Sequence, residues 1–337
     1  MRFNQLLCSS PKGLYCPPGD FYIDPVRPVE RALITHGHSD HARAGHAHVL
    51  ATPETLGIMA LRYGDGFAGT TQPIRLQESL TINGVRVSFH GAGHVLGSAQ
   101  IAVEMDGTRI VASGDYKRAA DPTCAPFEPV ACDVFITEAT FALPVFRHPD
   151  ASHEIATLLK SVRLFPERTY MVGAYSLGKA QRVIRLIRDA GYAEPIYIHG
   201  TLEKICDYYQ AQGIDLGRLE PAAPECDAGE VDFAGKIVVG PPSAFSDRSA
   251  RRFPDPVSAF ASGWMRIRQR ARQQGVELPL IISDHCDWDE LTATITEIAP
   301  AEVWVTHGRE EALIRWCELR GLSARPLNLI GYEDETD

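Results

Sequence analysis

The sequence predicts an α/β protein in which a second α/β domain interrupts the first. Residues 1–141 carry short strand-like runs separated by turn dipeptides, and residues 142–280 alternate helical segments with apolar runs. A strand and helix alternation resumes in residues 281–337. A chain of 337 residues is long enough for two domains. We therefore expect one domain built from 1–141 and 281–337, with an inserted domain at 142–280.

The first region contains hairpin signals. SLTINGVRVSFHG places Asn83 and Gly84 between two alternating runs, and AQIAVEMDGTRIVASGD places Asp106 and Gly107 in the same way. Asn-Gly and Asp-Gly favour the positive φ angles of a tight hairpin turn. We expect consecutive β-hairpins in this region.

The middle region has the sequence pattern of a parallel α/β unit. Helical spacing in SHEIATLLKSVRLF, LGKAQRVIRLIRDAG and LEKICDYYQAQG alternates with the apolar runs TYMVGAY, PIYIHG and KIVVGP. PPSAFSDRSARRFPDP is predicted to be a loop, and WMRIRQRARQ, taken as a strand, would present its arginines on one face. Further on, LIIS and EVWVT are predicted strands, and helices are expected from near Asp287 and in REEALIRWCELRG.

Composition narrows the class of protein. The net charge of −10 disfavours a protein coated all over by nucleic acid, but it permits a local basic groove. The eight cysteines include no C-x-x-C pair, which argues against a zinc ribbon or a disulfide framework. No signal peptide and no apolar run long enough for a membrane span is visible. We expect a cytoplasmic protein without a membrane partner.

The stretch ALITHGHSDHARAGH holds four of the chain's 12 histidines. His36 and His38 follow a predicted buried strand, where the two-residue period sends both side chains to one side and lets them share an ion. Asp40 and His41 come at a predicted helix start, with Ser39 or Asp40 as the N-cap. Imidazole and carboxylate ligands without a thiolate suit Zn²⁺ or Mn²⁺ at an open hydrolytic site. A histidine-rich surface loop is the structural alternative.

Three isolated residues add to this cluster. His94 in VSFHGAGH, Asp115 in IVASGDY and His307 in EVWVTHG each follow a strand-like run and lie beside a glycine. Taken singly, such a residue is more often a hydrogen-bonded loop residue than a ligand. Taken together, the three would complete the ligand sets of two metal ions.

The order of these motifs resembles the metallo-β-lactamase superfamily. HxHxDH, a histidine in a glycine-flanked turn, a Gly-Asp dipeptide and a late histidine follow one another between Phe21 and Gly308. The resemblance implies a four-layer αβ/βα sandwich with a dinuclear metal site at the edge of two β-sheets. Asp24, in FYIDPV, matches the superfamily's first motif and is expected to support the ligand loops from outside the metal shell.

Three residues resemble the motifs of one branch, the β-CASP nucleases: Glu138 in DVFITEATF, His285 in LIISDHCDW and His307 in VWVTHG. The resemblance implies cleavage of phosphodiester bonds in DNA or RNA, with 142–280 as the inserted β-CASP domain. The phrases SGDYKR, AYSLGKAQR, GPPSAF and FASGWM are most similar to bacterial ligase-associated DNA exonucleases. That similarity implies a role in DNA repair and a functional link to a DNA ligase and a helicase.

The resemblance also implies residue roles. The first metal would be held by His36, His38, His94 and Asp115, and the second by Asp40, His41, His307 and a bridging Asp115. Two divalent ions, Zn²⁺ by expectation and Mn²⁺ as the alternative, would activate a hydroxide. Asp40, His285 and Glu138 form the expected catalytic set, with His285 as general acid and Glu138 orienting it. As structural alternatives, Glu138 caps a strand end and His285 is a packed loop residue.

The positive charge that a phosphodiester substrate would need is concentrated in short stretches of the chain. Residues 248–272 contain seven arginines and one acid, Asp255, a local charge of +6. Gly178 is predicted to precede an amphipathic helix, and the N-terminus of this helix is predicted to bind phosphate. The expected substrate-binding residues are Ser176, Lys179, Arg182 and Arg248. A solvated surface is the usual meaning of such a basic run.

The leading hypothesis is a metal-dependent DNA exonuclease. The family resemblance leaves RNA open, because the histidine at the position of His307 is present in RNA-processing members and in many bacterial members, and is usually missing from the eukaryotic repair nucleases. A small-molecule hydrolase of the glyoxalase II or lactonase type would use the same ligands on a thioester or ester. A catalytically inert scaffold subunit is a further alternative, although such proteins typically lose ligands and none is missing here.

Overall fold

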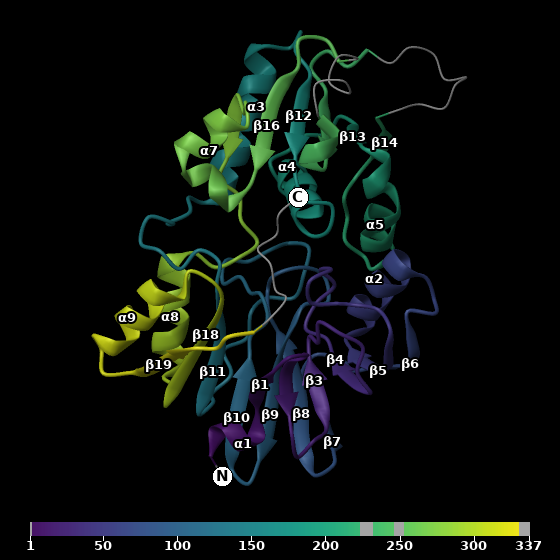
Figure 1. The fold of residues 1–337 in the computed structure, drawn as a ribbon. Coiled ribbons are helices and arrows are strands. Elements are labelled where there is room, and N and C mark those ends of the chain that lie inside the picture. The colour runs from purple at the N-terminus through teal and green to yellow at the C-terminus, as the bar shows by residue number, and fades with distance from the viewer. Residues whose placement is uncertain (1, 223–231, 246–252, 330–337) are drawn as a thin grey trace. The chain divides into compact units, whose positions relative to one another are not determined.

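The computed structural model describes residues 2–222, 232–245 and 253–329. The chain divides into two compact units (Figure 1). Unit 1 comprises the residues up to Arg147 and from His285 onward, and unit 2 comprises His148–Asp284. Within the described residues, no helix combines the length and the apolar character needed to cross a bilayer.

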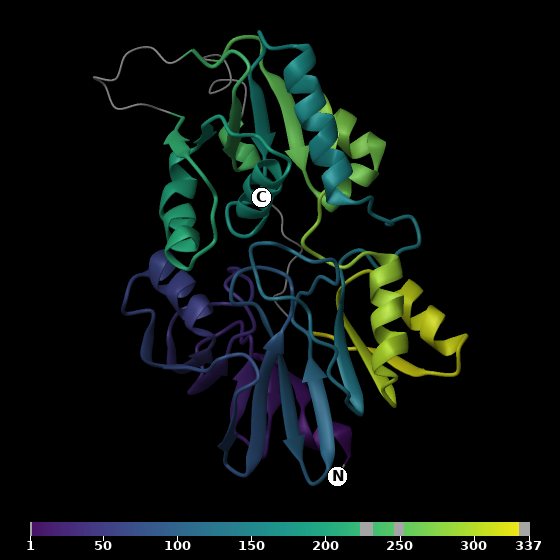
Figure 2. The ribbon, with the colours of Figure 1, turned by 180° about the vertical axis from the view of Figure 1, so that it is seen from behind.

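Unit 1 contains two β-sheets. The strands of the six-stranded sheet are, in spatial order, β1 (Cys8–Ser10), β2 (Gly13–Cys16), β3 (Phe21–Ile23), β4 (Arg31–Leu33), β5 (His46–Ala51) and β6 (Ala68–Pro73). Those of the seven-stranded sheet are β19 (Ser323–Pro326), β18 (Glu302–Gly308), β11 (Val134–Ala139), β10 (Thr108–Ala112), β9 (Ala99–Met105), β8 (Val85–Gly91) and β7 (Ser79–Ile82). Figure 2 shows the blue strands of the second sheet side by side.

The predicted hairpins are confirmed in the second sheet. Asn83 (φ 49°) and Gly84 (φ 85°) join the antiparallel β7 and β8, and Asp106 and Gly107 join β9 and β10. Between β3 and β6 the prediction of consecutive hairpins was wrong, because these strands run parallel. Parallel neighbours need longer crossovers, and one of these is helix α2 (Pro53–Tyr63).

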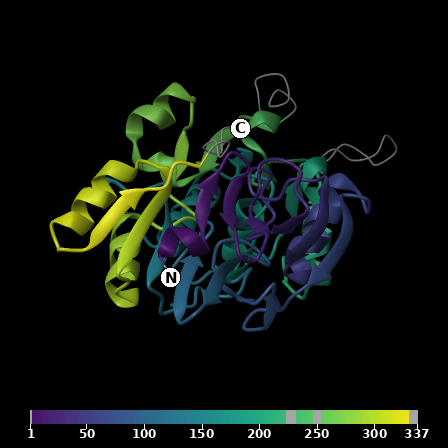
Figure 3. The same ribbon diagram turned by 60° about the horizontal axis from the view of Figure 1, so that its bottom comes forward.

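The core of unit 1 lies in three layers. Side chains from both sheets, such as Phe21 and Phe89, form the central cluster. The outer face of the first sheet packs on α2 through Met59. The outer face of the second sheet packs on α8 (Trp288–Ile298) and α9 (Glu310–Glu318). Figure 3 shows α2 and the yellow α8 and α9 at opposite sides of this unit, while the short α1 (Phe3–Leu6) precedes β1.

Unit 2 is built on a six-stranded sheet in which every described strand pair is parallel. This confirms the predicted parallel α/β unit. Its strands are, in spatial order, β14 (Leu219–Pro221), β13 (Ile196–Ile198), β15 (Ile237–Gly240), β12 (Tyr170–Gly173), β16 (Val257–Ala261) and β17 (Leu278–Leu280). Its helices are α3 (Ala151–Leu164), α4 (Lys179–Asp189), α5 (Gly200–Ala211), α7 (Arg268–Gln273) and the 3₁₀ turns η1 (Pro242–Phe245) and η2 (Gly263–Arg266).

Two local predictions near the end of unit 2 were wrong. WMRIRQRARQ forms η2 and α7 and is not a strand, so Arg266, Arg268, Arg270 and Arg272 do not share one face. Arginine, glutamine and alanine have high helix propensities, and Ala271 packs this short helix into a cluster with Phe260 and Met265. LIIS is not a strand either, because β17 ends at Leu280.

Candidate metal centre

The histidine-rich stretch begins where β4 ends. His36 and His38 lie in the loop after β4, as predicted, but SDHARAGH does not form the expected helix. The chain makes a single turn, closed by the Ala42 N–H donating to the His38 carbonyl at 2.7 Å. It then enters β5 at His46, and pairing of β5 with both neighbouring strands outweighs the weak helical preference of this stretch.

Four predicted ligands converge on one point. His38 Nδ1 lies 3.1 Å from His36 Nε2 and 3.1 Å from His94 Nε2. Asp115 Oδ2 lies 3.4 Å from His36 Nε2, and one ligand atom from each of the four residues lies within 4.8 Å of the others. Metal–ligand bonds of about 2.0–2.1 Å in a tetrahedron separate the ligand atoms by roughly 3.4 Å. The donor set and its spacing therefore fit a Zn²⁺-sized ion.

A second group adjoins the first and shares Asp115. His41 Nε2 lies 3.4 Å from Asp115 Oδ2 and 3.5 Å from Asp40 Oδ2. The His307 ring stacks on the His41 ring with 5.2 Å between the ring centres. The structure thus brings all seven predicted metal ligands together, with the Asp115 carboxylate between the two groups.

The predicted supporting residue, Asp24, contacts this group directly. Its buried carboxylate accepts hydrogen bonds from His41 Nδ1 at 2.8 Å and from the Thr35 hydroxyl at 2.6 Å. Because the Thr35 hydroxyl donates to Asp24, its oxygen is free to accept from His36 Nδ1, which lies 3.0 Å away. Both imidazoles then carry their proton on Nδ1 and direct the Nε2 lone pair at the metal position.

His307 owes its orientation to a β-bulge. β11 and β18 pair in parallel, with Glu138 opposite Thr306 and Ala139 opposite Gly308, so His307 is the extra residue. Its φ of 55° is in the left-handed region, which is uncommon for a residue other than glycine. Bulges of this kind re-aim side chains beside functional sites, and here the bulge places His307 against His41.

Burial and charge shift the pKa values of this cluster in opposite directions. Burial, and then the charge of His41, lower the pKa of His36 well below its usual value, and the same two causes lower that of His307 to about 4. Burial also opposes a charge on His41, but Asp115 and Asp40 outweigh it and raise its pKa. Burial opposes the Asp115 carboxylate as well, but His41 holds its pKa well below the usual range. His36 and His307 are thus held neutral beside an ionised Asp115, and a bound divalent cation would take over the positive charge that His41 carries and require that ring to be neutral as well.

Glu138 and His285 form a buried pair beside Asp115. His285 Nδ1 lies 2.9 Å from Glu138 Oε2, and Glu138 also accepts the Tyr116 N–H at 2.8 Å and the Thr140 hydroxyl. Burial raises the pKa of Glu138, while His285 opposes that shift. With Nδ1 donating to Glu138, Nε2 is the ring nitrogen that a role in proton transfer would use.

Sequence reasoning missed the residues that connect these loops. Thr35, Tyr116 and Thr140 each link a predicted ligand or catalytic residue to its neighbour through a hydrogen bond. A side chain at Gly114 (φ 58°) would bring its Cβ to 2.8 Å from the Thr35 Cβ, so the Asp115 loop packs directly on Thr35. The glycine of the Gly-Asp dipeptide was the visible signal of this close approach.

Sequence comparison finds two kinds of similar protein. The chain is 27% identical over 320 residues to a probable DNA ligase of Opitutus terrae, a match covering 93% of this chain and 30% of that protein. It is 34% identical over 135 residues to the endoribonuclease ysh1 of Emericella nidulans, covering 38% of this chain and 14% of that protein. These similarities support the resemblance of the chain to the β-CASP branch of the metallo-β-lactamase superfamily.

The chain spans less than a third of the length of either β-CASP-related protein. No family model matches it. The fold is similar to a crystal structure of a protein of unknown function from Enterococcus faecalis V583, with a TM-score of 0.55, 14% identity, and coverage of 89% of this chain and 80% of that one. At this identity the likeness concerns the fold alone.

The β-CASP resemblance led us to expect phosphate binding in unit 2, where the basic side chains already have acceptors. Lys179 Nζ lies 2.6 Å from Asp284 Oδ1, and both side chains are buried. Arg182 is also buried and donates from Nη1 to the Ser283 carbonyl at 2.7 Å. The Ser176 carbonyl accepts from the Gln181 amide, and Arg248 lies outside the described residues. Substrate binding by these four residues stays a prediction.

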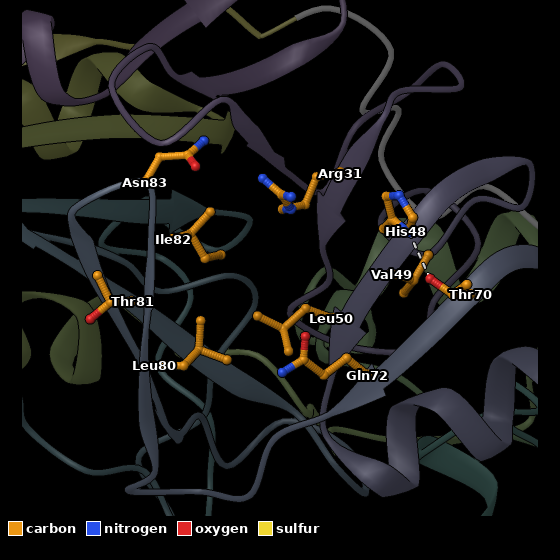
Figure 4. Close-up of a pocket in the computed structure, with 10 residues that line it drawn as sticks. All are labelled: Arg31, His48, Val49, Leu50, Thr70, Gln72, Leu80, Thr81, Ile82 and Asn83. Carbon is orange, nitrogen blue, oxygen red and sulfur yellow. Dashed lines mark hydrogen bonds between the residues drawn. The ribbon is translucent and has the colours of Figure 1, made fainter.

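Two other features of unit 1 lie apart from the β-CASP motifs. A cavity of about 400 Å³ has Arg31, Leu50, Leu80 and Asn83 among its lining residues (Figure 4), and none of the predicted site residues lines it. For His46, the fourth histidine of ALITHGHSDHARAGH, the sequence leaves open a supporting position beside the ligands or a position at the surface. The structure buries it in β5, where it accepts the Val29 N–H at 3.3 Å, so the surface alternative was wrong.

Proposed function

We propose that the chain is a metal-dependent nuclease that hydrolyses phosphodiester bonds. The observation that carries this proposal is the convergence of His36, His38, His94 and Asp115 within 4.8 Å, beside the Glu138–His285 pair. A metal ligand set alone fits any hydrolase of the superfamily. The additional Glu138–His285 pair and the similarity to β-CASP nucleases favour a phosphodiester substrate over a thioester or an ester.

The metal would be bound by residues of unit 1. We assign His36, His38, His94 and Asp115 to one ion, and Asp40, His41, His307 and the shared Asp115 to the other. Imidazole and carboxylate donors support Zn²⁺, with Mn²⁺ as the alternative. When bound, two such ions lower the pKa of a water ligand and neutralise charge on the phosphate. Asp24 contributes by holding His36, through Thr35, and His41 in the required tautomers.

His285 would act as the general acid. Glu138 accepts from Nδ1 and fixes the ring, so the opposite nitrogen can deliver a proton to the leaving oxygen. An imidazole suits this step because it titrates near neutral pH. Glu138 itself is held by the Tyr116 N–H and the Thr140 hydroxyl, which keeps its carboxylate oriented toward His285.

We also propose the domain organisation of the family for this chain, namely a four-layer metallo-β-lactamase sandwich with a β-CASP insertion at 142–280. The arrangement of α2, two sheets, and α8 with α9 in unit 1 supports the sandwich. The separate parallel sheet of unit 2 supports the insertion.

For the substrate, we propose DNA cleaved by an exonuclease activity in DNA repair, in the cytoplasm and in functional association with a DNA ligase and a helicase. The similarity along 93% of this chain to a protein named a probable DNA ligase supports this choice. The second candidate is an RNA-processing ribonuclease. It is favoured by the similarity to endoribonuclease ysh1 and by the presence of His307.

The test is incubation of the full chain with matched, end-labelled single-stranded DNA and RNA under Zn²⁺, Mn²⁺ or a chelator. Asp40→Ala is the inactive comparison, and Asp65→Ala, at an exposed position, is the matched control. We expect metal-dependent shortening of DNA from an end by the native chain and by Asp65→Ala only. Unchanged substrates under every metal would overturn the nuclease proposal, and cleavage of RNA alone would transfer it to the second candidate.

A further inference from the structure

The segment that follows Asp115 contacts three other loops of the metal centre. The Tyr116 N–H donates to Glu138 Oε1 at 2.8 Å, and the Tyr116 carbonyl accepts the Cys286 N–H at 2.8 Å. The Lys117 N–H donates to the Ala92 carbonyl at 3.0 Å, two residues before His94. The relative positions of a metal ligand, Glu138 and His285 thus depend on this one segment.

The Lys117 side chain turns inward and meets a glutamate. Its ammonium lies 2.5 Å from Glu290 Oε2, and only 6% of the Lys117 side chain is exposed. A buried ammonium without a counter-charge is strongly unfavourable, so this pair is required once the lysine is inside. The other oxygen of Glu290 accepts the Ala119 N–H at 2.7 Å, which adds a second link to the same segment.

Glu290 also belongs to the helix start that follows His285. The Asp287 N–H donates to Glu290 Oε2 at 3.1 Å, and the Glu290 N–H donates to Asp287 Oδ1 at 3.0 Å, a capping box at the beginning of α8. A capping box satisfies the first N–H groups of its own helix and needs no distant partner. Here the same carboxylate additionally holds Lys117 and Ala119, more than 170 positions earlier in the chain.

The packing around this link leaves little room for displacement. A Cβ at Gly93 (φ 74°) would lie 2.2 Å from the Lys117 carbonyl oxygen, so the loop that carries His94 touches the Lys117 backbone without a side chain between them. A shift of the Lys117 segment is therefore transmitted to the His94 loop as well as to Asp115.

We infer that Lys117 and Glu290 are positioning residues, which set the placement of Asp115 and His285 relative to each other. The inference rests on the proposed function for its catalytic consequence, but the contacts exist independently of it. A misplacement of about 1 Å in a reacting group can cost about a hundredfold in rate. Neither residue touches a predicted ligand atom, so both act through the loops they hold.

The chain offers a matched control in a second ion pair between the same two elements. Arg118 Nη1 lies 2.7 Å from Glu297 Oε2, with 27% and 48% of the two side chains exposed. Glu297 lies near the end of α8, away from the capping box. Glu297→Gln removes a loop-to-helix ion pair as Glu290→Gln does, but at a more exposed place where such a pair contributes little.

The experiment compares Glu290→Gln, Glu297→Gln and the double variant Lys117→Gln/Glu290→Gln. Readouts are amide hydrogen exchange in residues 113–121, Zn²⁺ affinity by chelator competition, and kcat and KM on the labelled substrate. For Glu290→Gln we expect faster exchange, weaker Zn²⁺ binding, and a kcat lowered about tenfold or more with KM changed less than about threefold. Glu297→Gln should match the native chain, and the neutral double variant should recover part of the loss.

The experiment tests the positioning role separately from the proposed function. If Glu290→Gln keeps the amide hydrogen exchange and the Zn²⁺ affinity of the native chain, the positioning role is overturned, whatever its activity. Equal effects of Glu290→Gln and Glu297→Gln would overturn it too, because they would show a general loop-to-helix tie. A native chain that cleaves no nucleic acid would overturn the proposed function, while the exchange and Zn²⁺ measurements would still decide the roles of Lys117 and Glu290.

Discussion

The metal centre of unit 1 and the basic side chains of unit 2 contrast in what their charges contact. In unit 1 the predicted ligands point their donor atoms at each other, with His36, His38 and His94 nitrogens as close as 3.1 Å. In unit 2, Lys179 and Arg182 are neutralised or satisfied by Asp284 and Ser283 of the same unit. The converging imidazoles therefore fit a cation-binding site, whereas Lys179 and Arg182 have acceptors within their own unit.

The largest effect is expected for Asp115→Asn, which tests the unit 1 side of the contrast. The amide keeps the size of the side chain but removes the charge shared by both ligand groups. We expect nuclease activity to fall on the order of a thousandfold or more, together with loss of bound metal. Metal content by elemental analysis and the end-label assay measure both, with Asp65→Asn as the exposed control. Retention of two metals per chain would contradict the bridging role.

Lys179→Met tests the unit 2 side. Removing one partner leaves the buried Asp284 carboxylate without its ammonium, which is expected to lower the free energy of unfolding by about 3–5 kcal/mol. Denaturant titration measures this change, and Lys179→Met/Asp284→Leu should recover most of it. If Lys179 instead binds substrate phosphate, the single variant will keep native stability and raise KM.

His285→Asn separates proton transfer from metal binding inside unit 1. We expect kcat to fall about a hundredfold while the metal content stays native, because the ring is assigned to the leaving oxygen and not to an ion. Elemental analysis beside the kinetic assay distinguishes the two roles. A variant that loses metal would place His285 among the ligands and remove the proposed acid.

The smallest effect is expected for Arg268→Gln and Arg272→Gln, which lie four positions apart on α7 with exposed side chains. Since the buried cations of unit 2 have internal acceptors, exposed arginines are the better candidates for phosphate contacts. Each substitution should change the free energy of unfolding by less than about 0.5 kcal/mol. Each lost phosphate contact should reduce the salt dependence of DNA binding by about one ion, measured by titration at several salt concentrations. Unchanged salt dependence in both variants would exclude α7 from the groove.

Local patterns predicted much of the fold. Hairpin turns at Asn83-Gly84 depend only on neighbouring residues, and the parallel sheet of unit 2 follows from its alternating segments. The failures occurred where sheet pairing overruled a short pattern, as in SDHARAGH, or where a basic alternating run proved helical, as in α7. In both cases the deciding contacts lie outside the window that the pattern covers.

The candidate site shows the same limit. HxHxDH is a local signal, whereas His94, Asp115 and His307 became candidates because each follows a strand-like run beside a glycine, and the family resemblance then implied their ligand roles. The acceptor of Lys179 lies 105 positions later and that of Lys117 lies 173 positions later. The sequence predicted a helix that starts near Asp287, as observed for α8, but no pattern in it indicated that Glu290 also holds Lys117.

The bulge at His307 has a consequence for the order in which the centre is completed. His36, His38, His94 and Asp115 all precede unit 2 in the chain, whereas His307 follows it and is aimed only after β18 has paired with β11. Under the proposed assignment, the four ligands of the first ion are therefore synthesised before unit 2, whereas the second ion also needs His307, which is synthesised after unit 2. The two ligand sets would become complete at different stages of synthesis.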